Sequence, residues 1–235
     1  MAFNYSPNIV TSGLTLYLDV ANNKSYFSGS TAWNDLSGNR NNGTLFNSPT
    51  YDSANLGSIV FDGIDDYMTT TLTTNYLNNS TQSIWYKWNG NNQFVTLLYL
   101  GNAGSNGFGL LLHDGTGGAI GNRIGVLYGG ITFNALSTSV ELTSNSWNHL
   151  VLTRNTTTTT LYNNGQFFDS TTNSPNTTTS YNFNYGSSTS WGAGGNVSNI
   201  SFYNRALTAT EVLQNYNALK GRFGLWVHRM EDQIL

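Results

Sequence analysis

The stretch SFYNRALTATEVLQNY, residues 201–216, predicts a single well-marked helix in a chain that is otherwise typical of strands and polar turns. Thr208 is suited to the N-cap position, and Glu211 three residues later can complete a capping box. Leu207 and Val212 occupy the two positions of a hydrophobic staple. The helix should therefore begin directly after Thr208.

One face of this helix is apolar, and Gly221 is placed to end it. The apolar stripe consists of Val212, Leu213, Tyr216 and Leu219. A helix with such a stripe buries it against another layer of structure. We expect it to lie on a sandwich, as a lid over an edge or an open end.

The composition favours a single domain built from β-strands. Of the 235 residues, 9% are charged and 14% are aromatic, while Asn, Thr, Ser and Gly are abundant. These residue types suit pleated strands and the turns between them. The formal net charge of -3, without a cluster of Lys or Arg, argues against nucleic acid or an anionic membrane as a partner. Because the chain has no cysteine, disulfides, thiolate chemistry and cysteine-bound zinc are excluded.

Short alternating segments separated by turn residues recur along the chain and predict a sandwich or barrel. Residues 58–72 would form a strand, a tight turn and a returning strand. Asn164 and Gly165, between two apolar runs, predict a hairpin because both turn positions need positive φ. One face of the first strand would carry Leu14, Leu16 and Leu18. The other expected strands are residues 83–88, 94–101, 147–154 and 196–204, and the predicted hairpin spans residues 159–168.

Five stretches together resemble laminin-G-like domains of the concanavalin A-like superfamily. In chain order they are LDVANNKSY, WNDLSGNRNNGTL, SIVFDGIDDYM, WNHLVLTRNTTTTTLYNNGQ and ISFYNRALTATEVLQNYNALKGRFG. The resemblance implies two antiparallel sheets in a jelly-roll sandwich, with the helix packed beside them. It implies one domain over residues 1–224, followed by a tail at residues 225–235.

Two segments, LDVANNKSYFSGSTAWNDLSGNRNNGTL near the start and NALKGRFG near the end, are also similar to virion proteins of tailed phages, including those that infect cyanobacteria. This resemblance implies a non-enzymatic structural protein on the virion surface, as a head decoration or a tail-fibre component. It would contact other virion proteins and be present in multiple copies. The alternative is an adhesin that binds host glycans through loops at one rim of the sandwich.

A glycan hydrolase is the third alternative, since the superfamily that the chain resembles includes glucanases. Retaining members carry acidic residues that alternate on one strand and bring two carboxyl groups to about 5 Å from each other. The chain has only Glu141, Glu211 and Glu231 as glutamates, and none is near a second acid at that spacing. We therefore expect no enzymatic activity.

The stretch FDGIDDY contains the densest acidic cluster, formed by Asp62, Asp65 and Asp66. Carboxylate oxygens on a turn suit Ca²⁺, and related laminin-G and pentraxin domains bind calcium at such a rim. The other interpretation is a turn in which Asp62 and Asp65 accept backbone hydrogen bonds around Gly63. No distant second set of acidic ligands supports calcium, so the structural turn is the preferred interpretation.

Ligand-binding candidates lie in one loop and on three tryptophans. The loop WNDLSGNRNNG could present Arg40 and Asn42 to a ligand, or it could be an Asx-type turn that closes on itself. Aromatic rings can stack on sugar rings, although most tryptophans of a jelly roll are in its core. The tryptophans that we select are Trp33, Trp88 and Trp191.

The C-terminal tail has apolar residues at helical spacing, which suits an amphipathic segment that docks onto a surface. These residues are Phe223, Val227, Met230 and Ile234. The tail would pack either on its own domain or, as an arm, on a neighbouring subunit.

Overall fold

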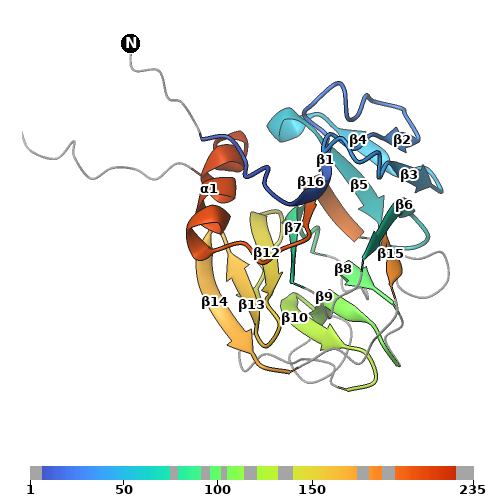
Figure 1. Cartoon of the computed structure of the whole chain (residues 1–235). Coiled ribbons are helices and arrows are strands. Elements are labelled where there is room, and N and C mark those ends of the chain that lie inside the picture. Colours follow the sequence, from blue (N-terminus) through green and yellow to red (C-terminus); the bar gives the residue numbers. More distant parts are fainter. Residues whose placement is uncertain are drawn as a thin grey trace, which may run out of the picture.

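The computed structural model is a sandwich of two antiparallel β-sheets with one α-helix (Figure 1). The structure describes residues 7–74, 79–90, 96–101, 105–113, 121–131, 140–173, 180–186 and 194–225. The predicted all-β jelly-roll sandwich with a short C-terminal helix is confirmed. Within these described ranges, no helix has the length and apolar character needed to cross a membrane.

The first sheet has the strand order β14-β13-β12-β7-β16-β5-β4, and β1 also pairs with β16. Its strands are β1 (Leu14–Asp19), β4 (Thr50–Asp52), β5 (Ser58–Asp62), β7 (Ser80–Lys87), β12 (Trp147–Arg154), β13 (Thr159–Asn163), β14 (Gln166–Thr171) and β16 (Gly194–Tyr203). One long strand, β16, organises this sheet. It pairs with β7 on one side, and on the other side it pairs first with β5 and then with β1.

The second sheet has the strand order β11-β10-β9-β8-β15-β6-β3-β2. Its strands are β2 (Ala32–Trp33), β3 (Gly43–Phe46), β6 (Tyr67–Thr74), β8 (Thr96–Leu100), β9 (Phe108–His113), β10 (Arg123–Tyr128), β11 (Val140–Glu141) and β15 (Tyr181–Tyr185). The predicted strand around residues 94–101 is therefore central in its sheet. The short strands β4 and β2 each end a sheet.

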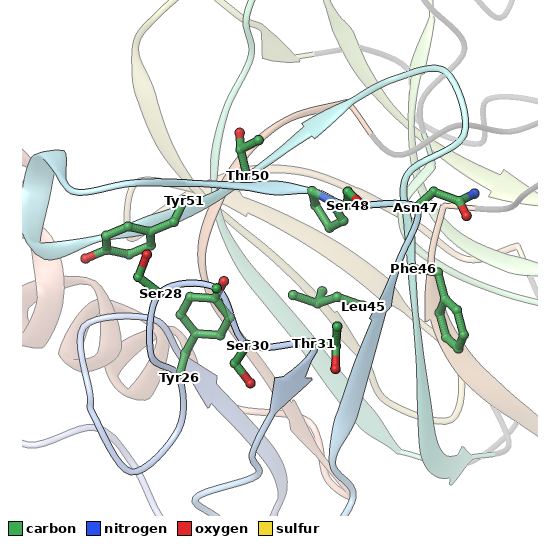
Figure 2. Close-up of a pocket in the computed structure, with 12 residues that line it drawn as sticks. Tyr26, Ser28, Ser30, Thr31, Leu45, Phe46, Asn47, Ser48, Thr50 and Tyr51 are labelled. Atoms are coloured by element: carbon green, nitrogen blue, oxygen red, sulfur yellow. The ribbon is translucent and has the colours of Figure 1, made fainter.

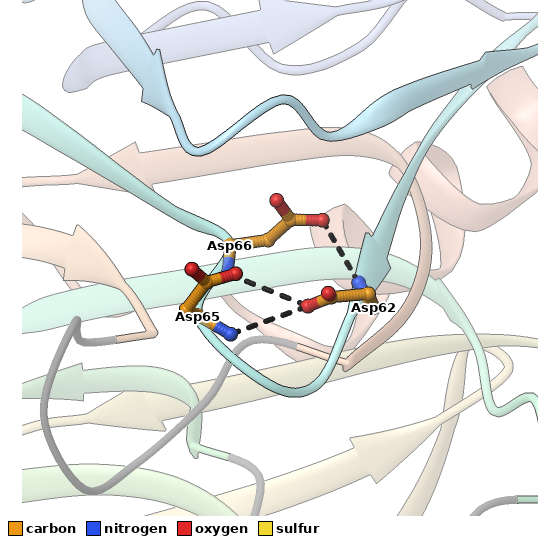
Figure 3. A group of neighbouring side chains, drawn as sticks. All are labelled: Asp62, Asp65 and Asp66. Atoms are coloured by element: carbon orange, nitrogen blue, oxygen red, sulfur yellow. Dashed lines mark hydrogen bonds between the residues drawn. The ribbon is translucent and has the colours of Figure 1, made fainter.

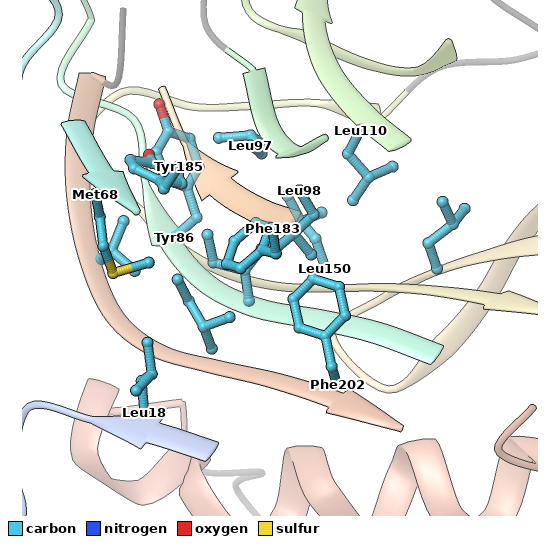
Figure 4. Packing of buried hydrophobic residues seen from close by; sticks show 14 of the residues in the cluster. Leu18, Met68, Tyr86, Leu97, Leu98, Leu110, Leu150, Phe183, Tyr185 and Phe202 are labelled. Atoms are coloured by element: carbon cyan, nitrogen blue, oxygen red, sulfur yellow. The ribbon is translucent and has the colours of Figure 1, made fainter. Parts of the chain in front are cut away.

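The main core lies between the two sheets, where aromatic rings from opposite sheets meet (Figure 4). Phe183 of the second sheet lies 4.6 Å from Phe202 of the first, measured between ring centroids. The rings of Phe61 and Tyr185 pair in the same way at 4.7 Å. Because strand side chains alternate between faces, every second residue of most strands enters this core, as the sequence pattern predicts.

The first strand departs from strict alternation. Leu16 and Leu18 enter the main core as predicted, but the register of β1 against β16 shifts between Leu14 and Leu16. A β-bulge changes the face to which the following side chains point. Leu14 therefore packs with the cluster under the helix, and the prediction that it shares a face with Leu16 and Leu18 is wrong.

Residues 58–72 do not form the predicted hairpin. Strand β5 belongs to the first sheet and β6 to the second, so the turn between them carries the chain from one sheet to the other. The alternation of apolar residues could not reveal this change of sheet. Phe61 of β5 and Met68 of β6 would point into the same core whether the two strands paired or lay in different sheets. By contrast, the hairpin at Asn164 and Gly165 is confirmed, with φ values of 51° and 78° between β13 and β14.

The helix α1 (Ala209–Leu219) begins as the sequence predicts. Thr208 Oγ1 accepts from the backbone N–H of Glu211 at 3.3 Å, and Glu211 Oε2 accepts from the N–H of Thr208 at 2.9 Å. Leu207 and Val212 are buried in one cluster, as a hydrophobic staple requires. The predicted capping box is therefore confirmed.

The end and the position of the helix differ from the predictions. After Leu219 the chain continues as a 3-10 turn, η2 (Lys220–Phe223), and Gly224 rather than Gly221 adopts the left-handed conformation, with φ of 69°. The helix covers the outer face of the first sheet instead of an edge or an open end (Figure 1). Trp85 and Trp147 on that face supply the apolar surface that holds it.

Replacing Glu211 with glutamine is expected to lower the free energy of unfolding by about 1 kcal/mol at pH 7. Hydrogen bonds from Arg205 are the main reason why the pKa of Glu211 falls to about 2. The lowered pKa of Glu211 stabilises the fold at pH values above 4.5, which is the ordinary pKa of a glutamate carboxyl group. This stabilisation is lost as the pH falls toward 2. The difference between variant and parent in urea unfolding should therefore shrink between pH 5 and pH 2.

Glu141→Gln is the matched control for this prediction, because Glu141 pairs with Arg123 at 3.2 Å on a more exposed part of the surface. Its removal should cost less than about 0.5 kcal/mol. An equal loss from both variants, or a loss at Glu211 that does not depend on pH, would contradict the prediction.

Candidate functional site

A cleft of about 550 Å³ lies beside the edge strands β4 and β2, where both sheets end (Figure 2). We call it the sheet-edge cleft. Two segments line it: a loop before β2 and the connection from β3 to β4. Its lining residues are Tyr26, Ser28, Gly29, Ser30, Thr31, Leu45, Phe46, Asn47, Ser48, Pro49, Thr50 and Tyr51.

Aromatic side chains connect the cleft to the core beneath it. The ring of Tyr51 lies 6.0 Å from that of Tyr26, and Tyr26 packs edge-on against Trp33 at 6.4 Å. Tyr51 is 38% exposed, whereas Trp33 is completely buried. Trp33 therefore supports the cleft from below and has no surface for a ligand, so its selection as a sugar-stacking residue is corrected.

The connection between β3 and β4 has an unusual backbone. Asn47 and Ser48 have φ values of 67° and 79°, in the left-handed region that residues other than glycine seldom adopt. The side chain of Asn47 also donates from Nδ2 to the backbone oxygen of Asp65 at 2.7 Å. Strained residues persist only where the surrounding structure holds them, and they cluster at binding sites.

The chemistry of the sheet-edge cleft is neutral. Hydroxyl and amide groups line it together with aromatic rings, and among the described residues that line it there is no Asp, Glu, Lys, Arg or His. Such a surface can exchange hydrogen bonds with a ligand and can stack on an apolar face. It does not supply the acid and base that a hydrolytic site requires.

The acidic cluster of Asp62, Asp65 and Asp66 lies in the turn that links the two sheets (Figure 3). Oxygen atoms of the three carboxylates lie within 4.8 Å of one another. The backbone N–H of Ile64 donates to Asp62 Oδ1 at 2.8 Å, and the N–H of Asp62 donates to Asp66 Oδ2 at 3.0 Å. These bonds fit the structural-turn interpretation for Asp62, but the second accepting carboxylate is that of Asp66, whereas Asp65 donates its backbone N–H to Asp62 at 3.3 Å. Calcium binding stays a prediction.

Burial raises the pKa of Asp66 to about 6, with further contributions from the neighbouring Asp62 and Asp65 carboxylates. We expect Asp66→Asn to raise the free energy of unfolding by about 1 to 2 kcal/mol at pH 7.5. A raised carboxyl pKa means that native stability falls as pH rises from about 4 to 6. The amide oxygen of asparagine can still accept the bond from Asp62. The gain in the free energy of unfolding over the parent chain should disappear near pH 4. Urea unfolding with EDTA present measures it.

Asp65→Asn serves as the control, because Asp65 is exposed in the same turn. It should change stability much less than Asp66→Asn. If the cluster binds calcium, excess Ca²⁺ would stabilise the parent chain at pH 7.5. It would stabilise Asp66→Asn and Asp65→Asn less than the parent. A constant gain from Asp66→Asn across the pH range would show that the carboxylate charge is not its cause.

The loop of Arg40 and Asn42 closes on itself around Asp35. Asp35 accepts from the backbone N–H of Ser37 at 2.8 Å and of Asn41 at 2.9 Å, and Asn42 Oδ1 accepts from the N–H of Asp35 at 2.9 Å. Arg40 is exposed, with φ of 63°. The side chain of Asn42 thus holds the turn, and neither residue lines the sheet-edge cleft.

The remaining predicted residues are not brought together. Trp88 is half-buried and packs against the main core. Phe223, one of the predicted docking residues, is 8% exposed and packs on Trp147 of its own domain, so it is not available to a neighbour. Trp191, Val227, Met230 and Ile234 lie outside the described residues.

Sequence reasoning missed the residues of the cleft itself. Tyr26 ends a stretch that predicts only the fold, and Phe46, Asn47 and Tyr51 lie between two such stretches, where the sequence led to no prediction. The segment TLFNSPTYD did carry a signal, because it places two aromatic residues on either side of a polar turn with proline. The signal says nothing about which other loop completes the site.

Two antiparallel sheets packed as a sandwich, with one short helix near the C-terminal end, are the architecture of concanavalin A-like domains. The family model "Laminin_G_3: Concanavalin A-like lectin/glucanases superfamily" matches residues 62–213. The chain belongs to this family. None of the curated proteins compared with the chain matches it.

Solved structures share the fold at low sequence identity. Domain 4 of the extracellular arabinanase AbnA from Geobacillus stearothermophilus, solved with arabinotriose, superposes with a TM-score of 0.64 at 20% identity, over 87% of this chain and 98% of that domain. Trypanosoma rangeli sialidase with sialic acid gives 0.63 at 16%, over 93% of this chain and 36% of the sialidase. The binding domain of botulinum neurotoxin serotype D gives 0.63 at 14%, over 88% and 52%.

This chain therefore spans about a third of the sialidase and about half of the toxin domain, but nearly all of the arabinanase domain. At these identities the comparisons establish the fold alone. The predicted laminin-G-like, concanavalin A-like fold is confirmed.

Proposed function

We propose that this chain is a non-catalytic glycan-binding domain. The observation that carries the proposal is the sheet-edge cleft, which combines exposed aromatic rings with hydroxyl and amide groups. Sugar rings stack their apolar faces on aromatic side chains and exchange hydrogen bonds through their hydroxyls. The arabinanase domain solved with arabinotriose has the same fold, which supports the proposal by analogy.

The positions of two glutamates support a binding role over hydrolysis. Glycoside hydrolysis needs a pair of carboxyl groups about 5 to 10 Å apart on either side of the scissile bond. Glu141 lies on β11, at the far edge of the second sheet, and pairs with Arg123. Glu211 is held in the helix cap by Thr208 and Arg205. Neither glutamate lines the sheet-edge cleft.

The proposed location is the surface of a tailed-phage virion, on the head or the tail. The support for it is the resemblance of residues 18–45 and 217–224 to virion proteins. On such a particle the domain would act either as a passive decoration or fibre component, or as an adhesin for host glycans. The cleft favours the adhesin, and multiple copies on one particle would add avidity to a weak single site.

Two measurements test these proposals separately. A glycan array probed with the recombinant chain should give binding without release of sugar products. Absence of binding across a broad array would overturn the glycan-binding role, and product release would overturn the non-catalytic role. Immunogold labelling of purified particles should place the protein on head or tail, and unlabelled particles would overturn the virion location.

A further inference from the structure

We propose that the sheet-edge cleft binds a chain of neutral sugars, with one ring stacked on Tyr51 and another on Phe46. This inference rests on the proposed glycan-binding function and assigns its site and the class of its ligand. Figure 2 places these two aromatic residues at opposite sides of the cleft, with Leu45 and Thr31 between them. The separation of the two rings favours a ligand of more than one sugar unit.

Tyr51 is a preorganised platform. Its ring is 38% exposed and packs against Tyr26, which in turn packs on the buried Trp33. The edge of the ring that carries the hydroxyl lies near Gly57, where a Cβ would come within 3.1 Å of the hydroxyl oxygen. A ring held by these contacts loses little conformational freedom on binding, which favours affinity.

Phe46 provides the second platform. It is 37% exposed and stacks on Tyr67, with ring centroids 4.7 Å apart and planes inclined by only 7°. This stacking covers one face of the phenyl ring and fixes its plane, so the opposite face is the one that a ligand can cover. A large exposed aromatic side chain fixed in this way is typical of recognition surfaces.

The polar groups between the platforms suit sugar hydroxyls. Ser28, Thr31 and Ser48 place hydroxyl groups along the cleft, and Asn47 adds an amide that its bond to Asp65 holds in place. The hydroxyl of Ser30 instead bonds to the backbone of Ala32. A cleft of about 550 Å³ falls within the range of about 300 to 1,000 Å³ that is usual for small-ligand sites.

The charges around the cleft favour a neutral ligand over an acidic one. No cationic side chain is among the lining residues. The neighbouring charges include the carboxylates of Asp52, next to Tyr51 in β4, and of Asp65, whose backbone oxygen accepts from Asn47. Lys87 offsets Asp52 at a distance of 3.7 Å, so it is not placed to attract an anion to the cleft. Sialic acids and uronic acids would therefore meet repulsion without a compensating cation.

The test is isothermal titration calorimetry with neutral oligosaccharides of increasing length, alongside sialylated and uronate-containing glycans, on the whole chain. Affinity should rise from one to three neutral units. Tyr51→Ala and Phe46→Ala should each weaken binding about tenfold, while Tyr51→Phe should keep most of it. Phe167→Ala is the matched control, because Phe167 is 62% exposed on β14, away from the cleft. It should leave the Kd unchanged.

The outcomes separate this inference from the proposed function. If the parent chain binds no glycan, the proposed function fails and the inference fails with it. If it binds neutral glycans equally well in the parent and in both alanine variants, the function stands and the cleft is the wrong site. A preference for acidic glycans overturns the ligand class. Thermal unfolding of each variant shows whether a loss of binding comes from a loss of fold.

Discussion

Replacing Arg222 with methionine is expected to lower the free energy of unfolding by about 3 to 5 kcal/mol. Nη1 of Arg222 donates to Asp19 Oδ1 at 2.6 Å, and Nη2 donates to Asp19 Oδ2 at 2.8 Å. Asp19 is only 2% exposed, so methionine would leave a buried carboxylate without its cation. The hydroxyl of Tyr17 would still donate to it at 2.9 Å, but a neutral donor does not replace the lost charge. Urea unfolding at pH 7 measures the loss.

A double-mutant cycle distinguishes this ion pair from ordinary packing. Combining Asp19→Asn with Arg222→Met should destabilise the fold less than the sum of the two single substitutions. Each single substitution leaves one buried charge unpaired, whereas the double substitution removes both charges. Arg123→Met is the control at an exposed ion pair with Glu141 and should cost less than about 1 kcal/mol. Additive losses would contradict the coupling.

Replacing Trp85 with alanine is expected to cost about 3 to 5 kcal/mol and to detach the helix from the sheet. The indole is fully buried on the outer face of β7. Its ring stacks on Phe223 at 4.2 Å, on His149 at 4.9 Å and on Tyr216 at 5.7 Å, so it joins the sheet to α1 and η2. Hydrogen exchange of the helix amides should show lost protection well before the sheets unfold.

Trp85→Phe is the matched variant. Among the described residues the indole nitrogen has no hydrogen-bond partner, so phenylalanine loses ring area but no hydrogen bond. We expect a loss of about 1 to 2 kcal/mol, with the helix still docked. A similar loss from both variants would mean that the aromatic stack does not carry the energy of docking.

The parts of the fold that could be predicted have local signals. The start of α1 depends on Thr208 and Glu211, three positions apart, and the β13–β14 hairpin depends on the adjacent Asn164 and Gly165. These residues determine their own backbone whatever the rest of the chain does. The sheet to which β6 belongs has no local signal, because both sheets bury alternate residues in one core.

The candidate site could not be predicted for the same reason. The sheet-edge cleft joins Tyr26 in one loop to Tyr51 in another, and Trp33 beneath them looks from its sequence like any surface candidate. The ion pair between Asp19 and Arg222 spans 203 positions in the chain. Contacts of this kind follow from strand order, which periodicity does not encode. The resemblance to laminin-G-like domains gave the architecture but no binding residues.

The position of β16 has a consequence for how this chain acquires its structure. Strands β1, β5 and β7 all pair with β16, a strand that follows them in the chain at a long sequence distance. Until residues 194–203 have left the ribosome, these strands have no central neighbour, and their apolar faces stay uncovered. Closing such long loops is slow, which is typical of all-β sandwiches. We therefore expect the first sheet to close only after β16 has been made, and the earlier strands to be exposed to aggregation until then.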